Sequence, residues 1–152
     1  MQIWVDADAC PHTIKDILFR AAERMQIVTT LVANTLLRTP SSPFIRAIRV
    51  ARGHDVADHR IAREMQPGDL VVTADIPLAA EVIARGGHAL DPRGELYSED
   101  NVSERLAVRN LMQSLRDGGE LLGGPAPLGQ SDRHQFANQL DRFLTRHRPP
   151  AS

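Results

Sequence analysis

Short apolar runs alternate along the chain with segments in which apolar residues recur at helical spacing. The runs predict five strands, at residues 2–5, 27–33, 44–50, 70–73 and 88–90. Intervals of three and four residues, as at Ile14, Leu18 and Ala22, predict helices over about 11–25, 55–65 and 77–85. Strands that alternate with helices predict a mostly parallel sheet with helices on both faces, a three-layer α/β sandwich.

The C-terminal third of the chain predicts two further helices. Asn101 is placed to cap the first of them, with Glu104 as its capping-box partner. The apolar positions of this helix are Leu106, Val108, Leu111, Met112 and Leu115. Glycine and proline are frequent over 117–130, which predicts a flexible connector, and a last helix with one apolar face is expected at 132–145. A length of 152 residues fits a single domain, 1–152.

Aspartates stand at or just after the ends of three predicted strands, as Asp6, Asp75 and Asp91. The carboxyl ends of parallel strands meet at one edge of a sheet, where such sheets bind their ligands. Asp8 lies two residues beyond Asp6, so the two side chains project to the same side if the backbone stays extended. We therefore expect carboxylates to gather at this edge. For Asp91 the alternative is a structural role in a turn, because proline follows it.

A further acidic pair lies in the sequence DVAD, where Asp55 and Asp58 are three residues apart and share one face of a helix. Like charges about 4 Å apart repel by ~4 kcal/mol at an effective dielectric of 20, and a whole domain is stable by only about 5–15 kcal/mol. Convergent carboxylates therefore need raised pKa values or a bound cation. Mg²⁺ and Mn²⁺ prefer oxygen ligands and activate water against a phosphodiester, so these ions are the expected cofactors.

Each aspartate also has a structural interpretation. Aspartate is a favoured N-cap residue, so Asp6 or Asp8 can cap the first helix, Asp55 the second and Asp75 the third. Asp69 stands in the turn Pro-Gly-Asp and is expected to serve the fold alone. The convergence of several carboxylates, rather than any one of them, favours a functional site.

Composition narrows the function classes without changing the fold. A net charge of −1 argues against a protein that coats DNA non-specifically. An enzyme with one local basic groove remains compatible with that charge. Cys10 is the only cysteine, which excludes an intramolecular disulfide and a cysteine zinc site. The sequence shows no signal-like segment and no run near the ~20 apolar residues of a membrane span, so we expect a cytoplasmic protein without a membrane partner. It indicates no oligomeric state.

Three arginines are candidates for contacts with substrate phosphates. Arg93 lies near Asp91, and Arg105 and Arg109 are four residues apart on one helix face. Ion pairs with carboxylates, or a solvated helix face, are the structural alternatives for all three.

With these residues in hand, the chain resembles the YaiI/YqxD family of bacterial proteins over nearly its whole length. The blocks that carry the resemblance are WVDADACP, DVADHRI, GDLVVTADIPLA, LDPRGELY, NVSERLAVRNLMQSLR and DRHQFANQLDRFL. That family is in turn similar to PIN-like domains, particularly to their NYN-type relatives, and so implies a PIN-like fold.

The PIN-like resemblance implies a set of roles for the aspartates. Asp6, Asp58 and Asp75 match the carboxylates that bind Mg²⁺ or Mn²⁺ in PIN-like nucleases, which hydrolyse RNA. Many NYN-type sequences carry a further aspartate shortly after the third of these, where this chain has Ile-Pro-Leu. The fourth carboxylate, as ligand or as the group that positions the attacking water, is then Asp8 or Asp91.

The leading hypothesis is a metal-dependent, nuclease-like hydrolase that acts on RNA or another phosphodiester. One alternative takes Asp-Ala-Asp as the paired aspartates of haloacid-dehalogenase-like phosphatases, a chemistry that also enlists a downstream lysine, whereas the only lysine here is Lys15. The other is a nucleic-acid or protein-binding module that has the same architecture without turnover.

Overall fold

The computed structural model describes residues 1–53, 55–119 and 127–147. The strands are β1 (Ile3–Asp6), β2 (Thr29–Ala33), β3 (Ile45–Arg49), β4 (Leu70–Val72) and β5 (His88–Leu90). The helices are α1 (His12–Met25), α2 (Val56–Glu64), α3 (Ile76–Ala84), α4 (Glu99–Asp117) and α5 (Gln130–Arg146), with a short 3₁₀ helix η1 (Ala7–Ala9) after β1. The predicted strands are all present.

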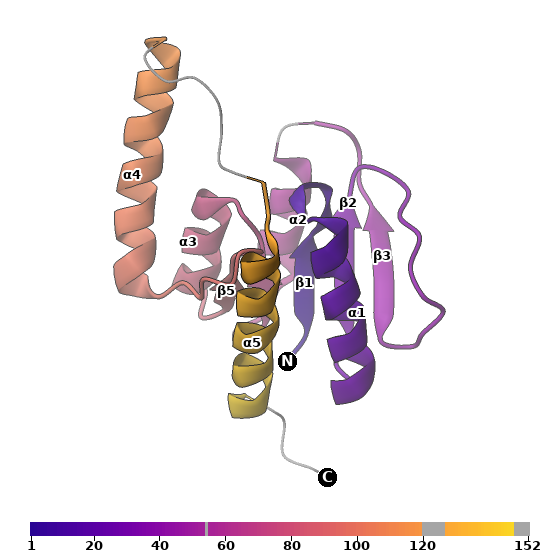
Figure 1. Cartoon of the computed structure of the whole chain (residues 1–152). Helices are drawn as coiled ribbons and strands as arrows, with labels where there is room; N and C mark the ends of the chain where they lie inside the picture. The colour runs from indigo at the N-terminus through magenta and orange to yellow at the C-terminus, as the bar shows by residue number, and fades with distance from the viewer. Residues whose placement is uncertain (54, 120–126, 148–152) are drawn as a thin grey trace.

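The five strands form one parallel sheet in the order β3-β2-β1-β4-β5. Helices α1 and α5 cover one face and α2 and α3 the other (Figure 1), which confirms the predicted α/β sandwich. From β1 the chain adds strands first on one side and then, after β3, on the other. The switch point between β1 and β4 opens a crevice at their carboxyl ends, where doubly wound sheets bind ligands.

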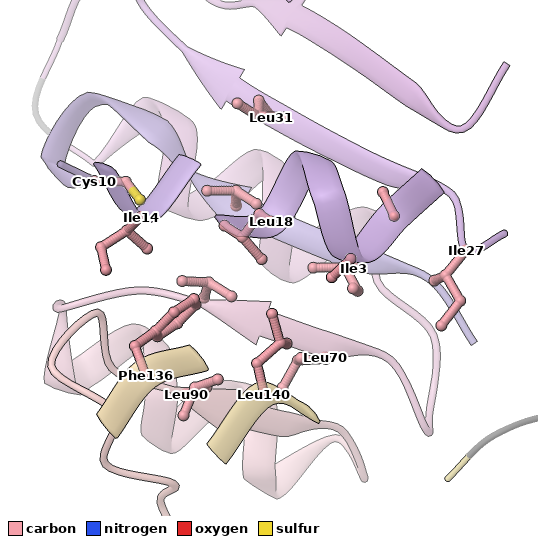
Figure 2. Close-up of a cluster of buried hydrophobic side chains, with 14 of the residues drawn as sticks. Ile3, Cys10, Ile14, Leu18, Ile27, Leu31, Leu70, Leu90, Phe136 and Leu140 are labelled. Carbon is pink, nitrogen blue, oxygen red and sulfur yellow. The ribbon is translucent and has the colours of Figure 1, made fainter. Parts of the chain in front are cut away.

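Alternation along β1 divides the buried side chains between two cores. Ile3 and Val5 point into the core under α1 and α5, whereas Trp4 points into the core under α2 and α3. Figure 2 shows Phe136 and Leu140 of α5 in the first core, opposite side chains of α1. Because β1 is buried on both faces, it is the most constrained strand from which a functional side chain can project.

Asp69 joins the amino ends of β1 and β4. Its carboxylate accepts hydrogen bonds from the backbone N–H of Gln2 (2.9 Å), the indole N–H of Trp4 (3.1 Å) and the backbone N–H of Gln66 (2.9 Å). The residue is only 5 % exposed. This network confirms the structural role expected for Asp69 and sets the register between the two strands that flank the crevice.

The helix α4 departs from expectation at its start and along its length. Ser98, not Asn101, is the N-cap, and Asn101 at the third helical position closes the capping box with it. Val108, Leu111 and Met112 are exposed, so the predicted apolar face does not enter a core. Within the described ranges, no helix has both the length and the apolar character needed to cross a membrane.

The last helix, α5, begins and ends slightly outside its predicted bounds of 132–145. The connector expected over 117–130 falls largely on residues 120–126, which lie outside the described residues.

We expect Asp69→Ala to lower the free energy of unfolding by about 2–3 kcal/mol, because buried N–H donors lose their acceptor. Urea denaturation followed by the fluorescence of Trp4, the only tryptophan, reports on this network directly. Asp16→Ala is the matched control: it removes an exposed aspartate from α1 and should change stability by no more than ~0.5 kcal/mol. Equal midpoints for the two variants would contradict the assigned role.

Candidate metal centre

The carboxylates gather at the switch point, where the crevice between β1 and β4 meets the first turns of α2 and α3. Asp6 is the last residue of β1, Asp58 lies in the first turn of α2, and Asp75 is the N-cap of α3. Three segments far apart in sequence therefore deliver carboxylates to one edge of the sheet, where the strand-end pattern predicted Asp6 and Asp75.

The side chain of Thr73 connects the end of β1 to the start of α3. Its hydroxyl donates to Oδ2 of Asp6 (3.1 Å) and accepts from the backbone N–H of Asp75 (2.9 Å). Thr73 is 1 % exposed, so this bridge is shielded from competing water. It fixes the end of β1 against the start of α3 and thereby sets the separation of Asp6 and Asp75.

Asp75 serves the fold as well as the cluster. Its Oδ1 accepts from the backbone N–H of Leu78 (2.9 Å), so the expected capping role is confirmed. The cap restrains the side chain of Asp75, which still offers an oxygen within 4.8 Å of oxygens of Asp55 and Asp58. Capping and metal binding are therefore compatible at this residue.

Asp55, Asp58 and Asp75 each offer an oxygen within 4.8 Å of the other two. Oxygens bound to one Mg²⁺ lie about 3.0 Å apart when adjacent and about 4.2 Å apart when opposite, since each bond is ~2.1 Å long. The three side chains would therefore draw closer together around a shared ion. Together with Asp6, which interacts with Asp58 and Asp75, these residues are called the acidic cluster below.

The electrostatics of the acidic cluster centre on Asp58. Burial raises its pKa to about 8, and a hydrogen bond with Asp75 and the charges of Asp6, Asp75 and Asp55 act in the same direction. Burial also raises the pKa of Asp6, opposed by the hydrogen bond from the Thr73 hydroxyl. Full ionisation is therefore unfavourable without a positive charge among the carboxylates.

Two hollows open on the acidic cluster, and Asp55 and Asp58 line both. The first hollow, of about 160 Å³, is also lined by Asp75 and by Arg109 of α4. The second hollow, of about 230 Å³, is also lined by Asp6, Asp8, Asn34 and the 50–53 loop. Either volume exceeds the ~30 Å³ share of one water, so an ion can keep water ligands here.

Asp8 reaches the second hollow by a different backbone path from the one expected. The chain leaves the extended conformation at Ala7 and forms η1, so the assumption of continued extension is wrong. Asp8 nevertheless lines the hollow, where its Oδ2 accepts from the backbone N–H of Asn34 (2.8 Å). It makes no capping bond to α1.

The structure does not bring Asp91 to the acidic cluster. Its Oδ1 accepts from the backbone N–H of Arg93 (2.6 Å), and its Oδ2 accepts from the hydroxyl of Tyr97 (3.2 Å). Both oxygens stabilise the turn after β5, as the structural alternative for this residue anticipated.

The three candidate arginines have different partners, and they do not share one site. Arg93 forms an ion pair with Asp132 of α5 (2.9 Å), and Arg105 binds both oxygens of Glu95 (3.0 and 2.8 Å). Only Arg109 of the three lines the first hollow. Arg109 is thus the one candidate placed to meet an anion bound at the carboxylates.

Two contributors to the site, Thr73 and Glu81, were not predicted from the sequence, and Asp55 was predicted as half of an acidic pair with a helix cap as its alternative role. Thr73 is recognisable only as the residue two before Asp75, a spacing that lets its hydroxyl accept from the Asp75 backbone. Asp55 occupies the N-cap position of α2 with φ 63°, yet its side chain makes no capping bond and joins the acidic cluster instead. Glu81, on the face of α3 above Asp75, lines the first hollow and pairs with Arg85 (3.1 Å).

Comparison with known proteins gives one consistent result. Residues 4–146 match the family described as "Uncharacterized BCR, YaiI/YqxD family". A UPF0178 protein of Dechloromonas aromatica is 64 % identical over 96 % of this chain and 97 % of its own length. UPF0178 proteins of Janthinobacterium sp. and Shewanella amazonensis are 60 % and 63 % identical, over 97 % and 96 % of this chain and 98 % of their own lengths. No solved structure matches. The matched segment covers nearly the whole chain and contains the entire acidic cluster. Because of this match, the chain belongs to the YaiI/YqxD family.

Proposed function

We propose that the chain is a cytoplasmic hydrolase that uses Mg²⁺ or Mn²⁺ to cleave a phosphodiester, with RNA as the leading substrate. The observation that carries the proposal is the convergence of Asp58 and Asp75 with Asp55 at the switch point of the sheet. Asp6 interacts with Asp58 and Asp75, and a divalent cation would relieve the charge repulsion among these carboxylates. The sequence resemblance to PIN-like nucleases supports the same three residues.

The roles follow from where each side chain lies. Asp6, Asp58 and Asp75 hold the ion, and Asp55 is available as a further ligand. The ion would supply Lewis-acid stabilisation of the scissile phosphate and a bound water of lowered pKa. Asp8 lines the second hollow and is therefore the better candidate for orienting the attacking water. Arg109 lines the first hollow and is the candidate for binding the phosphate.

The phosphatase alternative receives less support. An aspartyl-phosphate mechanism of that class would enlist a lysine beside Asp6, and the only lysine, Lys15, lines neither hollow. Burial, and to a smaller extent the charges of Asp75 and Asp8, also raise the pKa of Asp6, which disfavours the ionised nucleophile unless a cation is bound.

Labelled single-stranded RNA should be hydrolysed by the wild-type protein with Mn²⁺ or Mg²⁺ and remain intact in EDTA. We expect Asp6→Asn and Asp75→Asn each to lower the rate about a hundredfold or more, since several kcal/mol of transition-state stabilisation depend on the ion. Both substitutions keep the local hydrogen bonds, because asparagine still accepts from Thr73 at position 6 and still caps α3 at position 75. Activity that survives in the double variant rejects the proposal.

Metal binding can be measured without turnover. A saturating divalent ion, at about a hundred times its Kd, stabilises a protein by ~2.7 kcal/mol, which raises the melting temperature of a domain of this size by roughly 5–10 °C. We expect Mn²⁺ to produce this rise in the wild type at pH 8, a smaller rise at pH 5, and little in Asp58→Asn. Asp16→Asn, on α1, is the control that should behave as the wild type. Equal shifts in Asp58→Asn and the control would exclude the acidic cluster as the binding site.

The raised pKa of Asp58 has a consequence for the metal-free protein. Between the ordinary value of 3.8 and about 8, the folded state keeps a proton that the unfolded state has lost, so stability falls as pH rises. Asparagine at this position carries no such penalty. After discounting for solvent screening, we expect Asp58→Asn in EDTA at pH 8 to be more stable than the wild type by about 1 kcal/mol, or ~2–4 °C. At pH 4 the advantage should vanish, and an advantage independent of pH would contradict the assignment.

A further inference from the structure

A third hollow, of about 400 Å³, lies between α2 and the carboxyl end of β3, and basic side chains make up much of its lining. Arg49 comes from the carboxyl end of β3, while His59, Arg60 and Arg63 come from α2. We call it the arginine hollow. The fold thus brings Arg49 of β3 to the basic residues that α2 carries over 59–63.

The charge of the arginine hollow is poorly neutralised by the protein itself. Arg60 forms an ion pair with Glu64, whereas Arg49 and Arg63 have no carboxylate within ion-pair distance among the described residues. Several arginines elsewhere are matched by acidic partners, as in the pairs Arg24–Asp141, Arg85–Glu81, Arg93–Asp132 and Arg105–Glu95. Exposed, unpaired guanidinium groups that share a concave surface favour a polyanionic ligand.

The arginine hollow adjoins the candidate metal centre. His59 lines both it and the first acidic hollow, and Val50, Ala51 and Val56 line both it and the second. Asp58 and Arg63 are five residues apart on α2, which places them about 7–8 Å apart along the helix axis and about 140° apart around it. A strand that contacts both residues would therefore cross α2 from one side to the other.

We propose that the arginine hollow binds the phosphates next to the one held at the acidic cluster, so that the substrate is a single strand of nucleic acid rather than a small phosphodiester. The inference rests on the proposed function, because the acidic cluster defines where the scissile phosphate lies. A duplex would require a broad positive surface, whereas here a net charge of −1 accompanies a basic surface that one strand can follow across α2.

Binding is measured in an Asp6→Asn background, with Mg²⁺ present, by the fluorescence anisotropy of a short labelled single-stranded RNA at several salt concentrations. Arg49→Ala with Arg63→Ala should weaken binding at least tenfold. The slope of log K against log salt is negative, and each lost phosphate contact makes it shallower by ~0.7. With both arginines replaced, the slope should therefore be shallower by about 1.4. Replacing both arginines by lysine keeps the charges and should retain most of the slope. Arg20→Ala, an exposed arginine of α1 on the opposite face of the sheet, should change neither quantity.

A second measurement separates this inference from the proposed function. With Asp6 intact, the Arg49→Ala, Arg63→Ala protein should lose at least fivefold more activity toward the RNA than toward bis(p-nitrophenyl) phosphate, a diester without neighbouring phosphates. Equal losses on the two substrates, or RNA affinity equal to that of Arg20→Ala, would overturn the inference while leaving the role of the carboxylates intact. Salt-dependent RNA binding through the arginines with no hydrolysis of either substrate would overturn the proposed function and leave the arginine hollow as a nucleic-acid binding site.

Discussion

The parallel pairing of β1 with β4 is the constraint on which the whole site depends. It places Asp6 beside the segment that carries Thr73 and Asp75, and the buried Thr73 hydroxyl then bridges the two. At the opposite ends of the same strands, Asp69 fixes their register through three hydrogen bonds. The acidic cluster is therefore built at the end of a fully buried strand, with little freedom to spread apart.

That rigidity creates the electrostatic problem that a ligand can solve. Carboxylates on loops could move apart and take up water, but Asp6 and Asp75 are held by hydrogen bonds, and Asp58 lies between them. The raised pKa of Asp58 is the visible consequence. A proton and a divalent cation are alternative means of relief, and only the cation leaves the carboxylates ionised and ready for hydrolytic chemistry.

Surfaces of opposite charge lie on either side of α2. Its first turn carries Asp58 of the acidic cluster, whereas Arg60 and Arg63 contribute to the arginine hollow. A polyanionic strand that crosses this helix would meet positive charge on one side and a metal-neutralised centre on the other. The exposed apolar residues of α4 lie outside this path, although Arg109 of the same helix lines the first hollow.

Hydrophobic periodicity in the sequence determined the strands, the helices and the parallel sheet, because these patterns reflect local backbone geometry and burial. It also placed Asp6 and Asp75 at one edge, since parallel strands end together, whereas Asp58 was assigned to the same site by the resemblance to PIN-like domains. Only the tertiary structure decided which candidates meet: Asp55 joins the acidic cluster, Asp91 turns back to Arg93 and Tyr97, and Arg109 alone of three arginines reaches the hollow. The reason is physical, since a side chain's partners depend on contacts between segments that no local pattern encodes.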